Sequence, residues 1–205
     1  NTATAAAIEA VRARHPALPT VGVEPALKPA VALTPHGRIG VMATRGTLNS
    51  ARFAQLLAAM PPQADFVLQP CDGLAHAIER CTVEPEAGEQ VRALCRRYTQ
   101  DMGPIDTLVL GCTHYVFARD ALHALVGPTV RLIDTGEPVA RQTRRLLEAS
   151  GRLATPGEVA DDAADNVRLL TTGDLTALQA AAAQWLGLPA TACAQVALPM
   201  AASIG

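Results

Sequence analysis

Residues 106–111, with the sequence DTLVLG, are the feature of this chain that most limits its fold. A short run of consecutive apolar residues that ends in a glycine predicts a β-strand buried on both of its faces. A half-exposed antiparallel strand would instead alternate apolar and polar residues. The run therefore favours a parallel sheet that helices cover on both sides.

Strand-like and helix-like segments alternate along the whole chain. In chain order, the expected strands are residues 20–25, 38–44, 64–70, 106–111, 129–135, 166–174 and 191–199. The expected helices are residues 2–15, 49–60, 73–81, 88–102, 118–127, 137–150 and a last one that ends at Trp185, and the polar residues 151–165 are an expected loop. This alternation predicts an α/β fold with doubly wound parallel sheets, whose ligands bind beyond the carboxyl ends of the strands.

The composition argues against several classes of partner. With a net charge of −2 and 3% aromatic residues, the chain lacks the positive charge and the stacking side chains that nucleic-acid binding requires. The same charge gives no attraction to an anionic membrane surface, and no apolar run approaches the roughly 20 residues of a membrane-spanning helix. The 205 residues suffice for one large domain or two small ones.

The cysteines indicate a reducing environment. There are five of them, an odd number, and none belongs to a Cys-x-x-Cys pair: Cys71, Cys81, Cys95, Cys112 and Cys193. This pattern argues against a disulfide framework and against a structural zinc site. We therefore expect a cytoplasmic protein in which every cysteine except Cys112 is a packing residue.

Cys112, Thr113 and His114 follow directly after the apolar run. Taken singly, a cysteine at the end of a buried strand is most often a small core residue, and a lone histidine is most often packed or solvated. Together they suit chemistry, because free N–H groups at a strand-to-helix turn favour a thiolate. A neighbouring imidazole can then balance the proton of the thiol. The local sequence leaves open whether Cys112 is a nucleophile or a base.

The segment LVLGCTHYVF, residues 108–117, resembles the second cysteine motif of the glutamate racemase family, within the cofactor-independent Asp/Glu racemase superfamily. Four further segments match the family in the same order: NTATAAAIEAVR at residues 1–12, VGVEPALKPA at 21–30, GVMATRGTLNS at 40–50 and LTTGD at 170–174. Each motif alone is weak, but their order over almost the whole chain is specific.

The resemblance implies an enzyme that interconverts L- and D-glutamate with two cysteines, one on each face of the substrate. One thiolate removes the α-proton and the other thiol donates a proton to the opposite face. The resemblance implies no cofactor, and no lysine motif for a pyridoxal Schiff base is evident. It also implies glutamate as the small-molecule partner, a role in supplying D-glutamate for peptidoglycan in the cytoplasm, and a homodimer as an allowed assembly.

The family motifs assign roles to particular residues. Cys112 is expected to be the acid/base that acts on L-glutamate, His114 is expected to assist it, and Glu79 is expected to pair with the histidine. The expected substrate contacts are Asn1, Thr2, Thr44, Thr47 and Thr113. Simpler readings remain open for several of them: helix capping for Asn1 and Thr2, turn formation for Thr44 and Thr47, and a solvated helix position for Glu79.

The first catalytic cysteine of the family would stand immediately before Asn1, so we expect the chain to be a fragment that lacks about the first quarter of a typical member. We expect it to be inactive alone, because one face of the substrate would have no acid/base. In the family pattern there are two doubly wound parallel-sheet domains. Residues 1–25 and 135–205 belong to the first domain, which is incomplete here and is expected to expose apolar surface, and residues 26–134 form the second.

Three alternatives remain. Aspartate-specific relatives commonly have glutamate where this chain has His114, so the Cys-Thr-His order favours glutamate over aspartate as the substrate. A non-catalytic amino-acid-binding protein is a second alternative, although the retained Cys112 and His114 argue against it. A metal site built on these two residues is the third, but no further ligands follow at a recognisable spacing, so we expect no metal.

Overall fold

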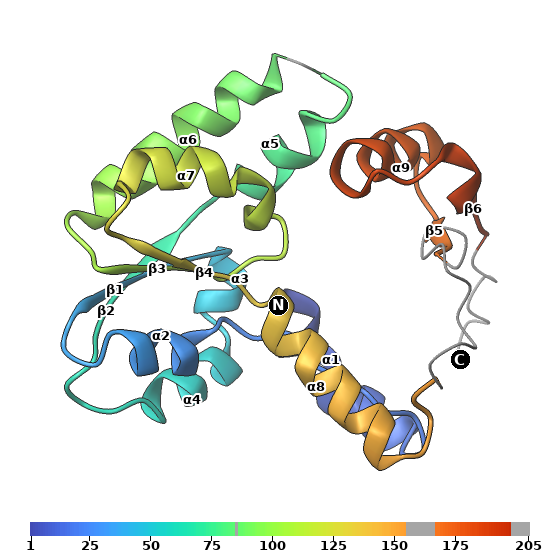
Figure 1. The fold of residues 1–205 in the computed structure, drawn as a ribbon, viewed down its shortest axis with the longest axis horizontal. Helices are drawn as coiled ribbons and strands as arrows, with labels where there is room; N and C mark the ends of the chain where they lie inside the picture. The colour runs from blue at the N-terminus through green and yellow to red at the C-terminus, as the bar shows by residue number, and fades with distance from the viewer. Residues whose placement is uncertain (85, 155–166, 198–205) are drawn as a thin grey trace, which may run out of the picture.

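The computed structural model describes residues 1–84, 86–154 and 167–197 (Figure 1). The strands are β1 (Arg38–Ala43), β2 (Asp65–Pro70), β3 (Thr107–Leu110), β4 (Arg131–Ile133), β5 (Leu169–Thr171) and β6 (Cys193–Gln195). The α-helices are α1 (Thr2–Arg14), α2 (Leu27–Leu33), α3 (Arg45–Leu48), α4 (Ala51–Ala58), α5 (Leu74–Arg80), α6 (Ala87–Met102), α7 (Arg119–Val126), α8 (Gly136–Ala149) and α9 (Leu175–Ala181). Shorter helical turns are η1 (Tyr115–Ala118), η3 (Ala182–Leu186) and η4 (Ala190–Ala192).

The central sheet has four parallel strands in the order β2-β1-β3-β4. Strand β3 lies in its interior and pairs with β1 on one side and β4 on the other, with Val109 opposite both Val41 and Ile133. All four residues of β3 are buried. The predicted doubly covered parallel strand is therefore confirmed, because a strand in this position has protein on every side.

Helices cover both faces of this sheet, with α5, α6 and α7 on one side and α2 and α4 on the other (Figure 1). The alternation of side chains along β3 divides the core accordingly. Leu108 and Leu110 pack with Tyr115 and the residues of α5, α6 and α7, whereas Val109 packs with Leu27 and Phe53 from α2 and α4. The doubly wound α/β class that the sequence predicts is the class that the structure has.

The C-terminal part forms a smaller parallel pair, β5 with β6. Its own apolar cluster contains Ala182, Leu188, Ala192 and Cys193, with Leu178 of α9 packed against it. Helix α8 precedes this part and has no buried residue, although half-buried Val139, Gln142 and Leu146 recur on one helical face. Within the described residues, the apolar side of α8 thus has only partial cover.

The structure corrects one local prediction and contains two helices that were not expected. Residues 20–25 do not form a strand: the N–H of Val23 donates to Oγ1 of Thr4 at 2.9 Å, so a side chain of α1 takes the place of a neighbouring strand. Helices α2 and α3 were not among the expected elements. Pro29 lies in the first turn of α2, where a missing N–H costs nothing.

The remaining predicted elements are confirmed with shifts of a few residues at their ends. The last predicted helix continues from α9 into the π-helical turn η3, and the predicted final strand is reduced to β6. Residues 155–166 of the predicted loop and strand start, and residues 198–199 of the predicted final strand, lie outside the described residues. Along the parts of the chain that the structure describes, no helix is both long and apolar enough to cross a membrane.

Candidate active site

Cys112 lies just beyond the carboxyl end of β3, where Gly111 connects the strand to the turn η1. The N–H of Gly111 donates to the carbonyl oxygen of Met42 on β1 at 2.7 Å. A Cβ atom at residue 111 would meet that same oxygen at 2.7 Å and the Cβ of Ala43 at 3.1 Å. Glycine is therefore required for this close approach, which places Cys112 at the edge where the strands of a parallel sheet present ligands.

The three residues predicted to be catalytic form a connected chain. The Sγ atom of Cys112 lies 3.6 Å from Nδ1 of His114, and Nε2 of His114 lies 2.7 Å from Oε1 of Glu79. Because the Glu79 carboxylate can only accept, Nε2 carries the proton that it shares with Glu79. Cys112 and His114 come from the loop after β3 and Glu79 comes from α5, so the fold places all three side chains in a row.

The electrostatics of this row favour a thiolate. Burial acts to raise the pKa of the Cys112 thiol, but hydrogen bonds from His114 and its positive charge lower that pKa below its ordinary value. The hydrogen bond with Cys112 is the largest cause that raises the pKa of His114 to about 8, and it is opposed by burial and reinforced by Glu79. The protonated imidazole and the thiolate therefore stabilise each other.

The other thiols near the core differ in this respect. Burial raises the pKa of Cys71, and burial raises the pKa of Cys95 to about 11. The pKa of Cys81 is also raised by burial. Cys112, by contrast, has a lowered pKa. The raised pKa values of Cys71, Cys81 and Cys95 agree with the prediction that these three cysteines are packing residues.

Three of the predicted substrate contacts form a cluster of hydroxyl groups. Oγ1 of Thr2 lies 3.2 Å from Oγ1 of Thr44 and 3.3 Å from Oγ1 of Thr47, and the last two hydroxyls are 2.9 Å apart. Thr44 also caps α3, because its Oγ1 accepts from the N–H of Thr47 at 3.2 Å. Thr44 thus caps a helix and also belongs to the hydroxyl cluster.

The side chain of Asn1 contacts the residue that precedes Cys112. Asn1 precedes the first residue of α1, but its side chain makes no capping hydrogen bond. Its Nδ2 atom donates instead to the carbonyl oxygen of Gly111, the residue before Cys112. Thr113 is exposed beside Cys112, and its side chain makes no hydrogen bond to any described residue.

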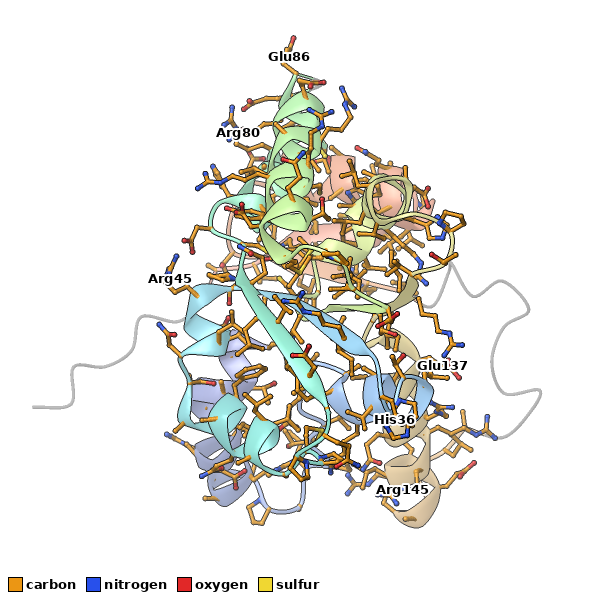
Figure 2. The ribbon with its side chains drawn as sticks, turned by 90° about the vertical axis from the view of Figure 1, so that its left-hand side faces the viewer. His36, Arg45, Arg80, Glu86, Glu137 and Arg145 are labelled. Carbon is orange, nitrogen blue, oxygen red and sulfur yellow. The ribbon has the colours of Figure 1, made fainter. Side chains whose placement is uncertain are left out.

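The sequence did not predict the ion pair between Arg45 and Asp72 beside the site. Arg45, the first residue of α3, donates from Nε to Oδ2 of Asp72 at 3.1 Å and bridges to the same oxygen from its NH2 group at 2.5 Å. Figure 2 labels Arg45 at the molecular surface, on the opposite side of the view from Glu137 of α8. No sequence signal relates these residues, because they are 27 positions apart and belong to different strand-to-helix connections.

A cavity of about 330 Å³ lies on the other side of His114 and Glu79. Phe117 of η1 and Trp185 of η3 both line it and stack with ring centroids 4.8 Å apart. Cys112 and the three threonines of the hydroxyl cluster do not line this cavity. The cavity therefore borders His114 and Glu79 but not the thiol.

A metal centre has no basis in the described side chains. Across residues 1–84, 86–154 and 167–197, no group of three or more His, Cys, Asp or Glu side chains is arranged to hold an ion.

Comparisons with known proteins identify the family of the chain. Residues 1–143 match the Asp/Glu/Hydantoin racemase family. A glutamate racemase from Ectopseudomonas mendocina (strain ymp) is 45% identical over 189 residues, which cover 91% of this chain and 68% of that protein. One from Pseudomonas syringae pv. tomato is 47% identical over 157 residues, which cover 76% of this chain and 56% of that protein. The chain thus spans about two thirds or less of the length of these relatives.

Two solved structures extend the agreement to the fold. The crystal structure of a glutamate racemase isoform from Bacillus anthracis has a TM-score of 0.77 at 27% identity, covering 97% of this chain and 71% of that one. The Escherichia coli glutamate racemase in complex with L-glutamate and the activator UDP-MurNAc-ala has a TM-score of 0.58 at 29% identity. The match covers 77% of this chain and 67% of that one. Sequence and structure together establish that this chain belongs to the Asp/Glu/Hydantoin racemase family.

Proposed function

We propose that this chain carries one half of a glutamate racemase active site, in which Cys112 exchanges the α-proton of L-glutamate on one face of the substrate. The observation that carries the proposal is the row from Cys112 through His114 to Glu79 at 3.6 and 2.7 Å. The curated relatives named above, which are glutamate racemases, support the choice of reaction.

The chemistry of the row fits proton abstraction. An α-proton of an amino acid is a weak acid, so its removal needs a base whose pKa lies near the working pH. A thiolate held beside an imidazolium meets that requirement, and Glu79 holds the imidazole in the orientation that places Nδ1 toward the sulfur. Once the thiolate takes up the α-proton, the reacting carbon carries the developing negative charge, which donors around the substrate carboxylate must stabilise.

The hydroxyl cluster of Thr2, Thr44 and Thr47 is the proposed set of carboxylate donors, together with Asn1 and Thr113. A cluster of neutral donors suits a substrate with two carboxylates, because the hydroxyl groups can reorient their protons toward an incoming oxygen. Three of these side chains already lie within 3.3 Å of one another. Thr2 comes from α1, whereas Thr44 and Thr47 come from the start of α3, so binding would require both segments.

Inversion of the α-carbon needs a second acid/base on the opposite face. The family pattern puts that cysteine immediately before Asn1, and the side chain of Asn1 contacts Gly111, next to Cys112. A residue attached to Asn1 would therefore start close to Cys112, which supports a two-thiol site. For the chain as it stands, we propose one-sided proton exchange without racemisation.

A cofactor-independent reaction is part of the proposal. Lys28 is the single lysine of the sequence, and it is exposed on α2, outside the row of Cys112, His114 and Glu79. A Schiff-base mechanism would need a lysine amine at the reacting centre. The thiol chemistry described above needs no such group.

The proposed reaction also implies a biological role and a cellular compartment. We propose that the intact enzyme supplies D-glutamate for peptidoglycan in a bacterial cytoplasm. The division into residues 26–134 as one domain, with residues 1–25 and 135–205 in the other, remains a prediction. The homodimer remains a prediction as well.

Deuterium exchange tests the proposal directly. The chain is incubated in D₂O with L-glutamate, D-glutamate or L-aspartate, and loss of each α-proton signal is followed by NMR. We expect exchange of L-glutamate alone, without formation of D-glutamate, and loss of exchange in Cys112→Ala. Cys95→Ala is the matched control, because its buried thiol lies in the core and should be dispensable for exchange.

Three outcomes would overturn parts of the proposal. Formation of D-glutamate by the chain itself would contradict the one-sided site. Preferential exchange of L-aspartate would assign the site to the other substrate. Binding of glutamate without exchange, both in this chain and in a version extended upstream of Asn1 by a cysteine-bearing segment, would leave only a binding protein.

A further inference from the structure

The two tyrosines of the chain converge on one short turn. The hydroxyl of Tyr98 on α6 donates to the carbonyl oxygen of Asp72 at 2.6 Å, and the hydroxyl of Tyr115 on η1 donates to the carbonyl oxygen of Cys71 at 3.3 Å. Both rings are buried, that of Tyr115 completely. Two phenols from distant segments thus hold two consecutive peptide groups.

This turn determines where α5 begins. It follows the last residue of β2 and ends at Gly73, whose φ of +79° is a left-handed conformation that favours glycine. Leu74 then starts α5, and Glu79 lies in the next turn of the same helix. A displacement of the Cys71–Gly73 turn would therefore move the carboxylate of Glu79, because a helix moves as a unit.

Tyr115 also lies directly after His114. Its backbone N–H donates to the carbonyl oxygen of Cys112 at 3.1 Å, which closes the loop that holds Cys112 and His114. Tyr115 thus contacts the loop of Cys112 and His114 through its backbone N–H, and it contacts the turn before α5 through its hydroxyl. It connects the two segments whose side chains meet in the 2.7 Å contact between His114 and Glu79.

We propose that Tyr115 is a positioning residue for the catalytic row, which sets the contact between Glu79 and His114 by anchoring the Cys71–Gly73 turn. Tyr98 supports the same turn from α6. The proposal deepens the racemase function proposed above, since it concerns the same site. It assigns no contact between either tyrosine and the substrate.

The titratable groups near this anchor are few. Cys112 and Glu79 adjoin His114, and the groups that act on the phenol of Tyr115 are Cys71, Cys112 and Tyr98. Cys95 and Asp72 adjoin Cys71 in turn. Burial raises the pKa of the Tyr115 phenol, and the pKa of the buried Cys71 thiol is raised in the same way. Both therefore stay neutral at physiological pH, so the hydroxyl of Tyr115 acts as a hydrogen-bond donor and not as a charge.

The test measures the titration of Cys112 without substrate. The chain is alkylated with iodoacetamide at pH 6 to 10 and digested with trypsin. Cys112 is then quantified in the peptide from Tyr98 to Arg119, where it is the single cysteine. We expect Tyr115→Phe to move the midpoint of alkylation upward by about half a pH unit, because a neutral hydrogen bond contributes roughly this much.

Two further variants separate positioning from stability. Thr107→Val removes another fully buried hydroxyl, 2.5 Å from that of Thr34, at the far end of β3. It should lower the melting temperature and leave the midpoint unchanged. In a Glu79→Gln background the effect of Tyr115→Phe on the midpoint should disappear, because the carboxylate through which Tyr115 acts is absent.

The inference is overturned if Tyr115→Phe lowers the melting temperature but leaves the midpoint where it is, or if its shift persists in Glu79→Gln. Neither result bears on the reaction, because no substrate is present. Conversely, a shifted midpoint in a chain that exchanges no glutamate would contradict the proposed function and leave the anchoring role intact.

Discussion

Nε2 of His114 lies 2.7 Å from Oε1 of Glu79, although the two residues are 35 positions apart in the chain. The carboxylate comes from α5 and the imidazole from the loop after β3. The other ring nitrogen lies 3.6 Å from the sulfur of Cys112. Protonation of the imidazole is therefore coupled on one side to a carboxylate and on the other to the thiol.

Replacement of His114 by Asn should make Cys112 a weaker acid. Removal of the imidazole removes the side-chain hydrogen bond and the charge that lower the pKa of Cys112, whereas burial still raises that pKa and the backbone hydrogen bond of residue 114 remains. At pH 7 the thiolate fraction should fall at least several-fold, since each pKa unit changes it about tenfold. Alkylation of Cys112 at several pH values measures this, and an unchanged profile would contradict the role of His114.

Replacement of Glu79 by Gln should reduce stability at low pH more than at high pH. The pKa of His114 is raised to about 8 in the folded protein, so its charged form contributes stability below its unfolded pKa of about 6.5. That contribution is lost as the pH rises through 8. Melting curves of both proteins should therefore differ at pH 6 and converge by pH 9.5, and a gap that widened with pH would disprove the pairing.

The threonines should separate binding from folding. Thr2→Val removes an exposed hydroxyl, so it should raise the KM for glutamate exchange with little effect on melting. Thr44→Val removes a hydroxyl of the same cluster and also the cap of α3, so it should additionally cost about 1 kcal/mol of stability. Equal KM values for Thr2→Val and the parent chain would remove Thr2 from the proposed binding set.

Replacement of Gly111 by Ala should disturb the thiol. Its Cβ would lie 2.7 Å from the backbone oxygen of Met42, which belongs to β1 and cannot move without shifting the sheet. We expect a lower melting temperature and a higher alkylation midpoint for Cys112. Gly88→Ala on α6 is the matched control, because its new Cβ would meet only the end of the Arg92 side chain at 3.7 Å. That control should be neutral or stabilising by up to about 1 kcal/mol, and a similar loss in both variants would contradict the argument.

Much of the fold was predictable because it depends on local patterns. The apolar residues of β3 and the helical spacing of Phe53 and Leu57 in α4 carry their own periodicity, and both elements formed where expected. The strand prediction for residues 20–25 was wrong, because two valines beside a proline resemble a strand when the segment is considered alone. Whether such a segment pairs depends on a neighbouring strand, and here the hydroxyl of Thr4 takes that place.

The sequence by itself determined that Cys112, Thr113 and His114 end a buried parallel strand, and its ordered motifs indicated the family. Tertiary structure alone decided which groups meet them: Glu79 from 35 positions away, Asn1 at Gly111 from 110 positions away, and Tyr115 at the turn before α5 from 44 positions away. Local periodicity is written into neighbouring residues, whereas these contacts exist only because parallel strands with helical crossovers bring their carboxyl ends to one edge of the sheet.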